Sequence, residues 1–426
     1  KTQDIEPTVA KPHSPDNRDT AFRCREVALD RAYIGSCTGG KITDFRAATL
    51  EGDLAARDYT VNALAVPVRA LLRDGRAPIV DPTGGLADLE ARRLRPPDPR
   101  VLAEDPLRTL RGARLEATLG LRLTPGAVRA IRAAAPTLAR ASAERVRDEL
   151  FTILALPDAA RVIRRVDALG LLAVVLPEVE PMRATRQPAP HRFDVLEHSL
   201  RALAAADRLL ARLHDLEPFG EELRAHVAEV LGGGIERGRV LKLAALLHDV
   251  AKPETARRVA GRLRFFEHDL VGAARVRAIG ERLRLPERVT AVASDLVRHH
   301  LRPMHLGASG VTLRARYRFF RDLGPNTRDL LLLALVDAAA VTGESPLRVW
   351  RRTPLIRDLL AGWREQQTAA QVPPLVRGGD VMERYGLRPG PDVGRLLERV
   401  REAQTLGLVT TREDALAFLD SCVGAS

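Results

Sequence analysis

The sequence predicts an α+β protein in which a mixed α/β head is followed by an all-α neck, a larger helical body and a helical tail. Short β-branched or apolar segments gather before residue 95, where KITDF (41–45) and YTVNALAVPV (59–68) alternate with turns such as DPTGG (81–85). From about residue 101, apolar residues recur at spacings of three and four, as in ERVRDELFTILAL, which is typical of amphipathic helices.

Breaks in this pattern divide the chain. Proline-bearing stretches interrupt it at RPPDP (95–99), PEVEPMRATRQPAPH (177–191) and QVPPLVRGGD (371–380), while GGG (232–234) is predicted to be a loop within the body. The predicted domains are a head at 1–95, a neck at 96–176, a helical body at 191–345 and a tail at 346–426. No internal repeat is apparent, so a solenoid is not expected.

Composition points to a polyanionic partner. The chain has 426 residues and a net charge of +12, which favours RNA or DNA as a partner. The alternative is that the arginines reflect a GC-rich genome and only cover the surface. Aromatic residues make up just 4%, which argues against a platform of stacked aromatic side chains.

The apolar runs and the cysteine content of the chain indicate its cellular location. No apolar run reaches the roughly 18–20 residues of a membrane span, and the first residues lack the apolar core of a signal peptide. The three cysteines, Cys24, Cys37 and Cys422, are too far apart for a disulfide framework or a cysteine zinc site. We therefore expect a cytoplasmic protein with no membrane contact, of a size that needs two to four domains. Its oligomeric state cannot be read from the sequence.

The stretch EDPLRTLRGAR (104–114) can recognise a base. If it is helical, Asp105 and Arg108 lie on one face. An ionised Asp accepts hydrogen bonds and an Arg donates them, so the pair matches the amino group and ring nitrogen of cytosine or adenine and opposes uracil and guanine. The alternative is a surface ion pair worth only a few tenths of a kcal/mol.

Three neighbouring stretches favour nucleotide binding over the ion-pair alternative. In RDYTVNALAV (57–66), Arg57 suits a phosphate, and Asp58 or Asn62 suits a sugar or phosphate. DPTGGLADLEARRLR (81–95) contains a glycine pair that permits a tight turn, and SAERVRDEL (142–150) forms a charged amphipathic face.

Four stretches resemble, in this order, the motifs of class II tRNA nucleotidyltransferases and bacterial poly(A) polymerases, the family of CCA-adding enzymes. They are RDYTVNAL, DPTGGLADLEARRLR, EDPLRTLRGARLEATLGL and ERVRDEL. The resemblance covers about residues 40–155 and implies a polymerase-β-like nucleotidyltransferase head. It implies that Asp105 and Arg108 select CTP and ATP. The nucleotide-binding residues that it implies are Arg57, Asp58, Asn62, Asp105, Arg108, Arg111, Arg114 and Arg145. Ala56 stands where the family often has a further arginine.

Catalysis by this family uses Mg²⁺ held by carboxylates. The resemblance implies an Asp-x-Asp after a glycine pair and an Arg-Asp, but that upstream pattern is not visible. Asp4 and Glu6 form the nearest acid pair, with a disordered terminus as the alternative, and Asp44 suits a third carboxylate. Because the chain starts at Lys1, we expect an N-terminally truncated head, weak or absent nucleotide addition, and recovery when upstream codons are restored.

A second set of residues lies in the body. His198 sits in DVLEHSLRAL, His248 and Asp249 in LLHDVAKPET, and Asp337 in LLLLALVDAAA, where an unpaired buried carboxylate would be costly. Imidazole and carboxylate together suit a divalent transition metal. This set resembles the HD phosphohydrolase superfamily, in which His198, His248, Asp249 and Asp337 would bind one metal. His268 and His300 match positions that bring a second metal in some members.

The main prediction is therefore an enzyme, a tRNA nucleotidyltransferase that adds C, A or both to tRNA 3′ ends from CTP and ATP. Its HD domain would act as a metal-dependent phosphohydrolase. One alternative is an HD phosphohydrolase or phosphodiesterase with an inactive head, and another is a non-catalytic RNA-binding remnant. The sequence does not separate CCA-, CC-, A-adding and poly(A) activity.

Overall fold

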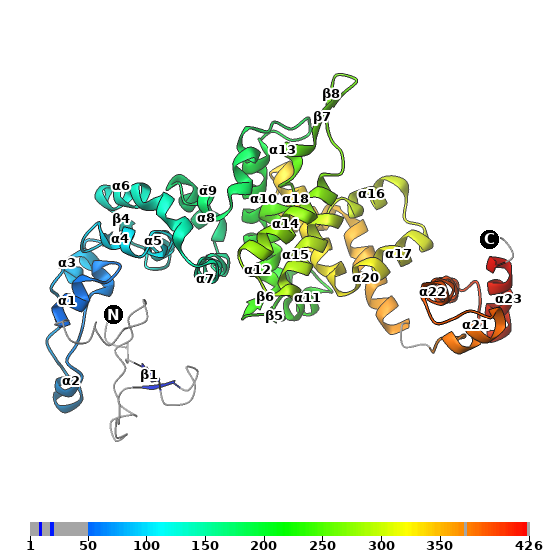
Figure 1. The fold of residues 1–426 in the computed structure, drawn as a ribbon, viewed down its shortest axis with the longest axis horizontal. Helices are drawn as coiled ribbons and strands as arrows, with labels where there is room; N and C mark the ends of the chain where they lie inside the picture. The colour runs from blue at the N-terminus through cyan, green and yellow to red at the C-terminus, as the bar shows by residue number, and fades with distance from the viewer. Residues whose placement is uncertain (1–7, 11–17, 21–49, 370–372, 424–426) are drawn as a thin grey trace. The chain divides into compact units, whose positions relative to one another are not determined.

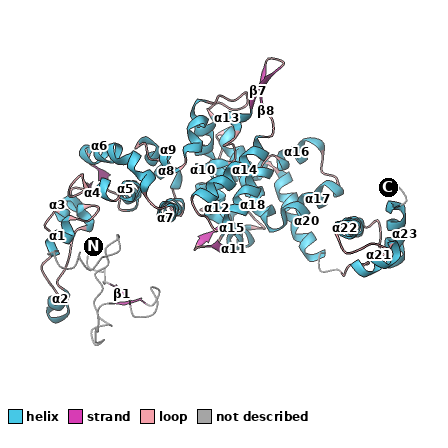
Figure 2. Cartoon of the chain, viewed as in Figure 1, coloured by secondary structure: helices cyan, strands magenta, loops and turns pink. Residues whose placement is uncertain are grey.

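A computed structural model describes residues 8–10, 18–20, 50–369 and 373–423 of the chain (Figure 1). It divides into two compact units, residues 1–141 and residues 142–426. Helices dominate the described parts of both units, and the strands there occur as short pairs (Figure 2).

The described residues of the first unit combine short helices with two strand pairs. β1 and β2 are antiparallel, with Thr8 opposite Thr20, whereas β3 and β4 are parallel, with Arg93 opposite Arg122. Its elements are β1 (Thr8–Ala10), β2 (Arg18–Thr20), α1 (Leu50–Ala55), η2 (Thr60–Asn62), α2 (Val68–Asp74), α3 (Gly85–Glu90), β3 (Arg93–Leu94), α4 (Val101–Glu104), α5 (Leu107–Thr118), β4 (Arg122–Leu123), α6 (Pro125–Ala134) and η3 (Ala135–Arg140).

The expectation of β structure at residues 59–68 is wrong. The 3₁₀ helix η2 begins at Thr60, α2 begins at Val68, and Ala65 alone keeps a β-bridge, to Val80. Pro67 accounts for part of the difference, because it cannot donate to a ladder and instead lies at the N-cap of α2. The other expected strand, KITDF, lies outside the described residues.

The predicted tight turn before α3 is confirmed. Gly84 adopts φ +77°, and Asp81 accepts hydrogen bonds from the backbone N–H groups of Gly85 at 2.7 Å and Leu86 at 2.9 Å. A Cβ on Gly85 would lie 2.2 Å from the carbonyl oxygen of Thr60, so glycine is required for this close packing. The turn therefore holds α3 against η2.

The second unit begins with four short helices, α7 (Ala143–Leu154), α8 (Ala159–Ala168), α9 (Leu172–Val175) and η4 (Pro177–Ala184). Residues 177–191, predicted to be a linker, are partly structured. Val179 and Met182 of η4 are fully buried, and η4 packs on α10. The prolines that suggested a linker are accommodated by the short 3₁₀ helix.

Helices form the core of the body. α12 is surrounded by protein, with the apolar residues from Val240 to Leu247 buried on every side, and it packs against α10, α15 and α18. The other elements of the body and its C-terminal extension are α10 (Val195–Leu210), η5 (Leu213–Asp215), α11 (Gly220–Val227), β5 (Val230–Gly232), β6 (Ile235–Glu236), α12 (Arg237–Leu247), α13 (Lys252–Thr255), β7 (Ala256–Val259), β8 (Arg262–Phe265), α14 (His268–Arg282), α15 (Glu287–His299), α16 (Arg302–Ser309), α17 (Leu313–Leu323), η6 (Gly324–Asn326), α18 (Thr327–Thr342), α19 (Pro346–Arg352) and α20 (Pro354–Ala369).

Two hairpins correct the expectation that everything after residue 101 is helical. β5 pairs with β6 around the predicted GGG turn, and β7 pairs with β8 around Ala260 and Gly261, which both have positive φ. Two successive residues with positive φ suit the tight turns that match the twist of a hairpin. Four arginines in β7 and β8 hide the apolar alternation by which a strand is usually found.

The tail is a small helical bundle. Its helices are α21 (Gly378–Tyr385), α22 (Pro391–Thr405) and α23 (Arg412–Val423), whose core includes Val381, Val400 and Leu419. Among the described residues no single helix is long and apolar enough to cross a membrane. One pair bent by 106°, Leu313–Thr342 with Pro346–Arg352, passes by length and composition together.

Candidate functional site

Asp105 and Arg108 are neighbours in the first unit, but not on one helix. Asp105 has extended backbone at the break between α4 and α5, and the N–H of Arg108 bonds to its carbonyl oxygen at 3.0 Å. The expectation of a shared helical face is therefore wrong, because Pro106 disfavours helical backbone in the residue before it. The side chains are still adjacent, with Arg108 Nε 3.8 Å from Asp105 Oδ2.

The Asp105–Arg108 pair is largely removed from water. The side chains are 3% and 12% exposed, and one arm of the Arg108 guanidinium donates to the carbonyl oxygen of Val101 at 3.3 Å. Arg108 Nε is buried and has no hydrogen-bond partner among the described residues. Because buried donors are normally satisfied, this nitrogen suits an acceptor supplied by a ligand.

Asp58 connects the two motifs of this unit. One carboxylate oxygen accepts from the backbone N–H of Tyr59 at 2.8 Å and from the side chain of Asn62 at 3.1 Å, and the other accepts from Arg111 at 2.9 Å. Tyr59 is fully buried and donates to the carbonyl oxygen of Arg108 at 3.0 Å. Both oxygens of Asp58 are thus engaged by the protein itself, which makes Asp58 an anchor for Arg111.

The remaining predicted nucleotide-binding residues lie in several places. Arg57 is paired with Asp53 at 2.9 Å, and Arg114 is half-buried on α5. Arg145 lies on α7, in the second unit. The predicted head carboxylates, Asp4, Glu6 and Asp44, lie outside the described residues.

Asp88 is a structural residue that sequence reasoning missed. It is buried, accepts from the Thr60 hydroxyl at 2.8 Å and pairs with Arg95 Nε at 2.7 Å and Arg93 Nε at 3.2 Å. It therefore ties the segment after α3 to η2, next to Asp58. The available signal in the sequence was Asp88 followed by Arg93 and Arg95, a pattern that by itself is typical of an exposed charged face.

The second unit brings the predicted metal-binding residues together from five helices. His198 projects from the second turn of α10, and Asp337 from α18. His248 caps the C-terminus of the buried helix α12, so the chain leaves that helix at His248 and Asp249. His268 starts α14, and His300 caps α15.

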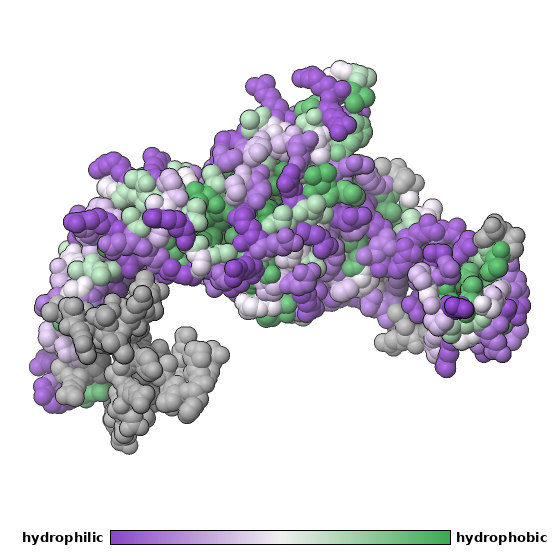
Figure 3. All heavy atoms as spheres, viewed as in Figure 1, coloured by the Kyte–Doolittle hydropathy of each residue, from purple (hydrophilic) through white to green (hydrophobic). Residues whose placement is uncertain are grey.

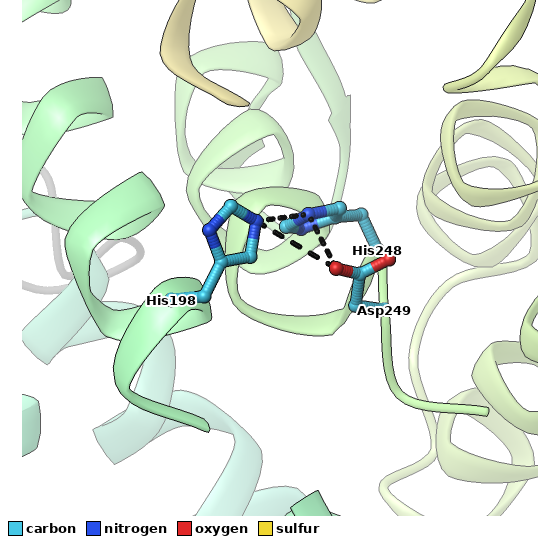
Figure 4. A group of neighbouring side chains, drawn as sticks. All are labelled: His198, His248 and Asp249. Carbon is cyan, nitrogen blue, oxygen red and sulfur yellow. Dashed lines mark hydrogen bonds and ion pairs between the residues drawn. The ribbon is translucent and has the colours of Figure 1, made fainter. Parts of the chain in front are cut away.

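One group of ligand atoms surrounds the Oδ2 atom of Asp249. His198 Nε2 lies 3.1 Å from His248 Nε2, and these nitrogens lie 3.6 and 3.3 Å from Asp249 Oδ2 (Figure 4). Oδ1 of Asp337 lies 3.1 Å from His198 Nε2 and has no hydrogen-bond partner among the described residues. Its side chain as a whole is 31% exposed, so Asp337 is less buried than its apolar surroundings in the sequence suggest, but Oδ1 itself is buried.

A second group surrounds the other oxygen of Asp249. Its Oδ1 lies 3.4 Å from His268 Nε2 and 3.6 Å from His300 Nε2, and these two nitrogens are 3.2 Å apart. The ligand atoms of His198, His248 and Asp249 lie within 4.8 Å of one another, and so do those of Asp249, His268 and His300. Asp249 therefore offers one oxygen to each of two adjacent sites, the arrangement of a bridging carboxylate.

Backbone carbonyls orient three of the imidazoles. The Nδ1 atoms of His248, His268 and His300 lie 3.0, 2.8 and 2.7 Å from the carbonyl oxygens of Ala245, Phe265 and Val297, each three residues earlier in the chain. Since a carbonyl only accepts, each Nδ1 carries the hydrogen. Each Nε2 then faces the cluster, where the unprotonated imidazole presents a lone pair, as metal-binding histidines do when their other ring nitrogen donates to a carbonyl.

Charges around the cluster shift its pKa values in opposite directions. Burial disfavours a charged His248, but Asp249 and Asp337 outweigh it and raise its pKa to about 10. Burial, aided by His248, lowers the pKa of His300 to about 4. Burial opposes ionisation of Asp249, yet His248 and Lys252 hold the pKa of this carboxyl well below its usual range.

Lys252 and Gln187 were missed by sequence reasoning. Lys252 Nζ lies 2.6 Å from Asp249 Oδ2 and 2.6 Å from Gln187 Oε1, so it places a positive charge beside the first ligand group. Its position three residues after Asp249 was the available signal. Gln187 lies in the proline-bearing segment before α10, where no pattern pointed to a site.

Family models match three consecutive parts of the chain. They are described as a poly A polymerase head domain over residues 13–95, a probable RNA and SrmB-binding site of polymerase A over residues 120–183, and an HD domain over residues 195–340. The predicted α+β fold with a polymerase head and an HD domain is thereby confirmed.

Curated relatives extend along most of the chain. An A-adding tRNA nucleotidyltransferase of Deinococcus radiodurans is 39% identical over 379 residues, which cover 87% of this chain and 79% of the relative. A CC-adding tRNA nucleotidyltransferase of Thermus thermophilus is 34% identical over 398 residues, covering 91% and 82%.

Solved structures agree at the level of the fold. A CCA-adding enzyme in complex with ATP matches with a TM-score of 0.54 at 17% identity, covering 88% of this chain and 72% of the other. The CCA-adding enzyme of Bacillus stearothermophilus in complex with CTP matches with a TM-score of 0.50 at 24% identity, covering 88% and 75%.

Proposed function

Because the chain belongs to the tRNA nucleotidyltransferase family, we propose that it transfers nucleotides from CTP, ATP or both to the 3′ end of tRNA. In this reaction the terminal 3′-oxygen of the RNA attacks the α-phosphorus. The bond from the α-phosphorus to the oxygen bridging it to the β-phosphorus breaks, and pyrophosphate leaves. The relatives include both A-adding and CC-adding enzymes, so the nucleotide must be found by experiment.

Base selection is assigned to Asp105 and Arg108. A carboxylate accepts from the exocyclic amino group that cytosine and adenine share, while the buried Nε of Arg108 donates to a ring nitrogen. Uracil and guanine present a carbonyl and an N–H at these positions. The carbonyl would face the carboxylate, so two acceptors would meet, and the N–H would face Arg108 Nε, so two donors would meet. Because the two side chains are largely buried, an unmatched group would keep most of its desolvation cost, so we expect the pair to discriminate between the bases.

Arg111 is proposed to bind the triphosphate and Asp58 to orient it. The observation that supports this is the 2.9 Å bond from Arg111 to Asp58, which fixes the guanidinium on α5 on the same helix as Arg108. Arg57, Asn62, Arg114 and Arg145 remain predicted nucleotide contacts. Mg²⁺ at Asp4, Glu6 and Asp44 also remains a prediction.

The test of nucleotide transfer is incorporation into tRNA that ends at the discriminator base, with each NTP alone and in combination. With a form extended by any codons that precede Lys1 in its gene, we expect incorporation of C, A or both, and no incorporation of U or G. In Arg108→Ala, selection for CTP and ATP over UTP and GTP should fall by roughly 1–3 kcal/mol. Arg129→Ala, an exposed arginine of α6, is the matched control. Unchanged selectivity in Arg108→Ala would leave only the ion-pair interpretation.

We propose a second activity, hydrolysis of phosphoesters, at the HD cluster. It is supported by the two ligand groups that share Asp249, and by the buried Asp337 oxygen beside His198, which accepts no hydrogen bond from the described residues. His198, His248, Asp249 and Asp337 would hold one divalent transition metal, and Asp249, His268 and His300 a second. Such ions, when bound, lower the pKa of water and stabilise charge on a phosphoryl group. The protein's own contribution is to fix the imidazole tautomers and to place Lys252 beside the cluster.

This second activity can be separated from the first. His248→Ala should abolish metal-dependent hydrolysis of a 2′,3′-cyclic phosphate, in which water adds to phosphorus and one P–O bond to the ribose breaks. It should leave nucleotide addition largely intact. His214→Ala is the control, because His214 is an exposed histidine of the same body. Equal loss of both activities in a folded His248→Ala protein would contradict two separate sites.

The same assays distinguish the alternatives. Hydrolysis without any nucleotide addition would indicate an HD hydrolase with an inactive head. Binding of tRNA without either reaction would indicate a non-catalytic RNA-binding protein.

A further inference from the structure

A basic hairpin extends from the body beside the metal cluster. In Figure 1, β7 and β8 extend beyond the helices around them. Arg257 lies opposite Arg264, and Val259 lies opposite Arg262. Since directly opposed residues share a face and side chains alternate along a strand, Arg257, Arg262 and Arg264 project from one face. We call these three residues the arginine face.

The charge of the arginine face is not neutralised by the protein. Within the part of the chain that the structure describes, none of its three side chains forms an ion pair or hydrogen bond. All three are exposed, and Figure 3 shows hydrophilic side chains on the projecting hairpin. On nearby α14, by contrast, Arg275 pairs with Glu254 at 2.7 Å and Arg282 with Glu178 at 2.9 Å. Like charges directly opposite each other destabilise a strand pair, so an external anion would relieve a built-in repulsion.

The segments at both ends of the hairpin contribute contacts to the metal cluster. β7 follows directly on α13, whose first residue, Lys252, holds Asp249. At the end of β8, the carbonyl oxygen of Phe265 lies 2.8 Å from Nδ1 of His268, and the Phe265 ring centroid lies 5.6 Å from Lys252 Nζ. A molecule bound along the hairpin would therefore lead to the two ligand groups of Asp249.

Chemistry favours a nucleic acid strand as that molecule. Arginine forks suit successive phosphates, and an exposed aromatic ring beside them gives a base a surface to stack on. Phe266, the residue that follows β8, is 56% exposed. Single-stranded RNA offers both groups in a repeating order, whereas an isolated phosphate would need only one arginine.

We propose that the arginine face binds the backbone of a single-stranded RNA end and delivers its terminal phosphoester to the HD cluster. This inference rests on the proposed function of the HD cluster as a phosphohydrolase. It adds a substrate class, an RNA end rather than a free nucleotide, and a surface that selects it.

The experiment compares two double variants of the full chain. Arg257→Ala/Arg264→Ala removes the opposed pair, while Arg208→Ala/Arg277→Ala removes two exposed arginines of α10 and α14 and the same charge. Hydrolysis is measured on an RNA ending in a 2′,3′-cyclic phosphate and on bis(4-nitrophenyl) phosphate. For the hairpin variant we expect the KM for RNA to rise roughly tenfold or more, with kcat unchanged and the small diester hydrolysed normally. The control variant should behave like the wild type.

The salt dependence of RNA affinity gives a readout that does not need hydrolysis. Each phosphate contact on a single strand contributes about 0.7 to the slope of log K against log salt, so loss of two should reduce the slope by roughly 1.4. If hydrolysis is absent in the wild type, the HD activity is refuted, and this slope alone decides whether the arginine face binds RNA. An unchanged KM and slope, or equal changes in the control, would overturn the inference. Loss of activity on the small diester would overturn it as well, since the hairpin would then act by supporting His268.

Discussion

Asp58 accepts a 2.9 Å hydrogen bond from Arg111 and so joins two motifs that are 53 residues apart in the chain. The same carboxylate also holds Asn62 and the backbone of Tyr59. Both oxygens of Asp58 are therefore engaged within the protein, and we propose that Asp58 contributes to activity by holding Arg111 in place.

A first prediction separates orientation from base reading. Asp58→Asn weakens the charge-assisted bond to Arg111 while keeping the size of the side chain. We expect slower addition with CTP and ATP alike and unchanged selectivity against UTP and GTP. Arg108→Ala should show the converse, altered selectivity. Single-turnover addition with each NTP measures both quantities, and a selectivity change in Asp58→Asn would show that Asp58 reads the base.

A second prediction concerns packing around Tyr59. A Cβ on Gly112 of α5 would lie 1.9 Å from the Tyr59 hydroxyl oxygen, so Gly112→Ala forces α5 and η2 apart. Overpacking of this kind costs about 1–3 kcal/mol, more than the roughly 1 kcal/mol that alanine gains over glycine in a helix. Hydrogen exchange of the α5 amides should become faster.

The control for this prediction is Gly126→Ala on α6. There the nearest atom to the added Cβ is 3.9 Å away, an ordinary contact. Its exchange should be unchanged or slower than in the wild type. If the α5 amides of Gly112→Ala are as well protected from exchange as those of the wild type, Tyr59 can move aside without a loss of stability, and the prediction is wrong.

A third prediction concerns the bridging carboxylate. Asp249→Asn keeps the shape but removes the charge that both ligand groups share, so it should abolish binding of both metal ions. His300→Ala should remove only the second ion, because His300 faces only the Oδ1 side of Asp249. The metal content of the purified proteins is measured by inductively coupled plasma mass spectrometry. It should be two ions per chain in the wild type, none in Asp249→Asn and one in His300→Ala. One ion retained in Asp249→Asn would contradict bridging.

A fourth prediction gives the pH dependence of metal binding. With a pKa raised to about 10, His248 carries a proton at neutral pH in the metal-free protein, and a metal ligand must be neutral. Binding at the first group therefore releases a proton, and affinity should rise about tenfold per pH unit between pH 6 and 9.

The second group should behave differently. Burial keeps His300 neutral above its lowered pKa of about 4, so no proton needs to leave that imidazole. Calorimetry in buffers of different ionisation enthalpy, on the wild type and on His198→Ala, separates the two groups. Proton release that persists undiminished in His198→Ala, or affinity that does not change with pH, would contradict the assignment to the first group.

Several parts of the site could be predicted because local sequence determines them. His248 and Asp249 stand at the end of an apolar helical run that Pro253 interrupts, and the structure ends α12 there. Asp105 and Arg108 are three residues apart, so their side chains are close in almost any turn. These features depend on short-range geometry.

Other parts depend on packing between distant elements. The bond between Asp58 and Arg111 and the contact between Lys252 and Gln187 join segments 53 and 65 residues apart, and no periodic pattern encodes them. The division of Asp249 between two histidine groups follows from how α12, α14 and α15 meet. The hairpin β7–β8 was missed because arginines occupy positions where a strand usually shows apolar alternation.

The central claim is that this chain builds tRNA 3′ ends with a protein-made template for C and A. The most direct measurement is sequencing of the 3′ ends of a tRNA that stops at the discriminator base, after incubation with all four NTPs. It should be made with the chain and with a form extended by any codons that precede Lys1 in its gene. The account predicts that the added residues are C, A or both. Addition of U or G at comparable frequency, or no addition by either form, would contradict it.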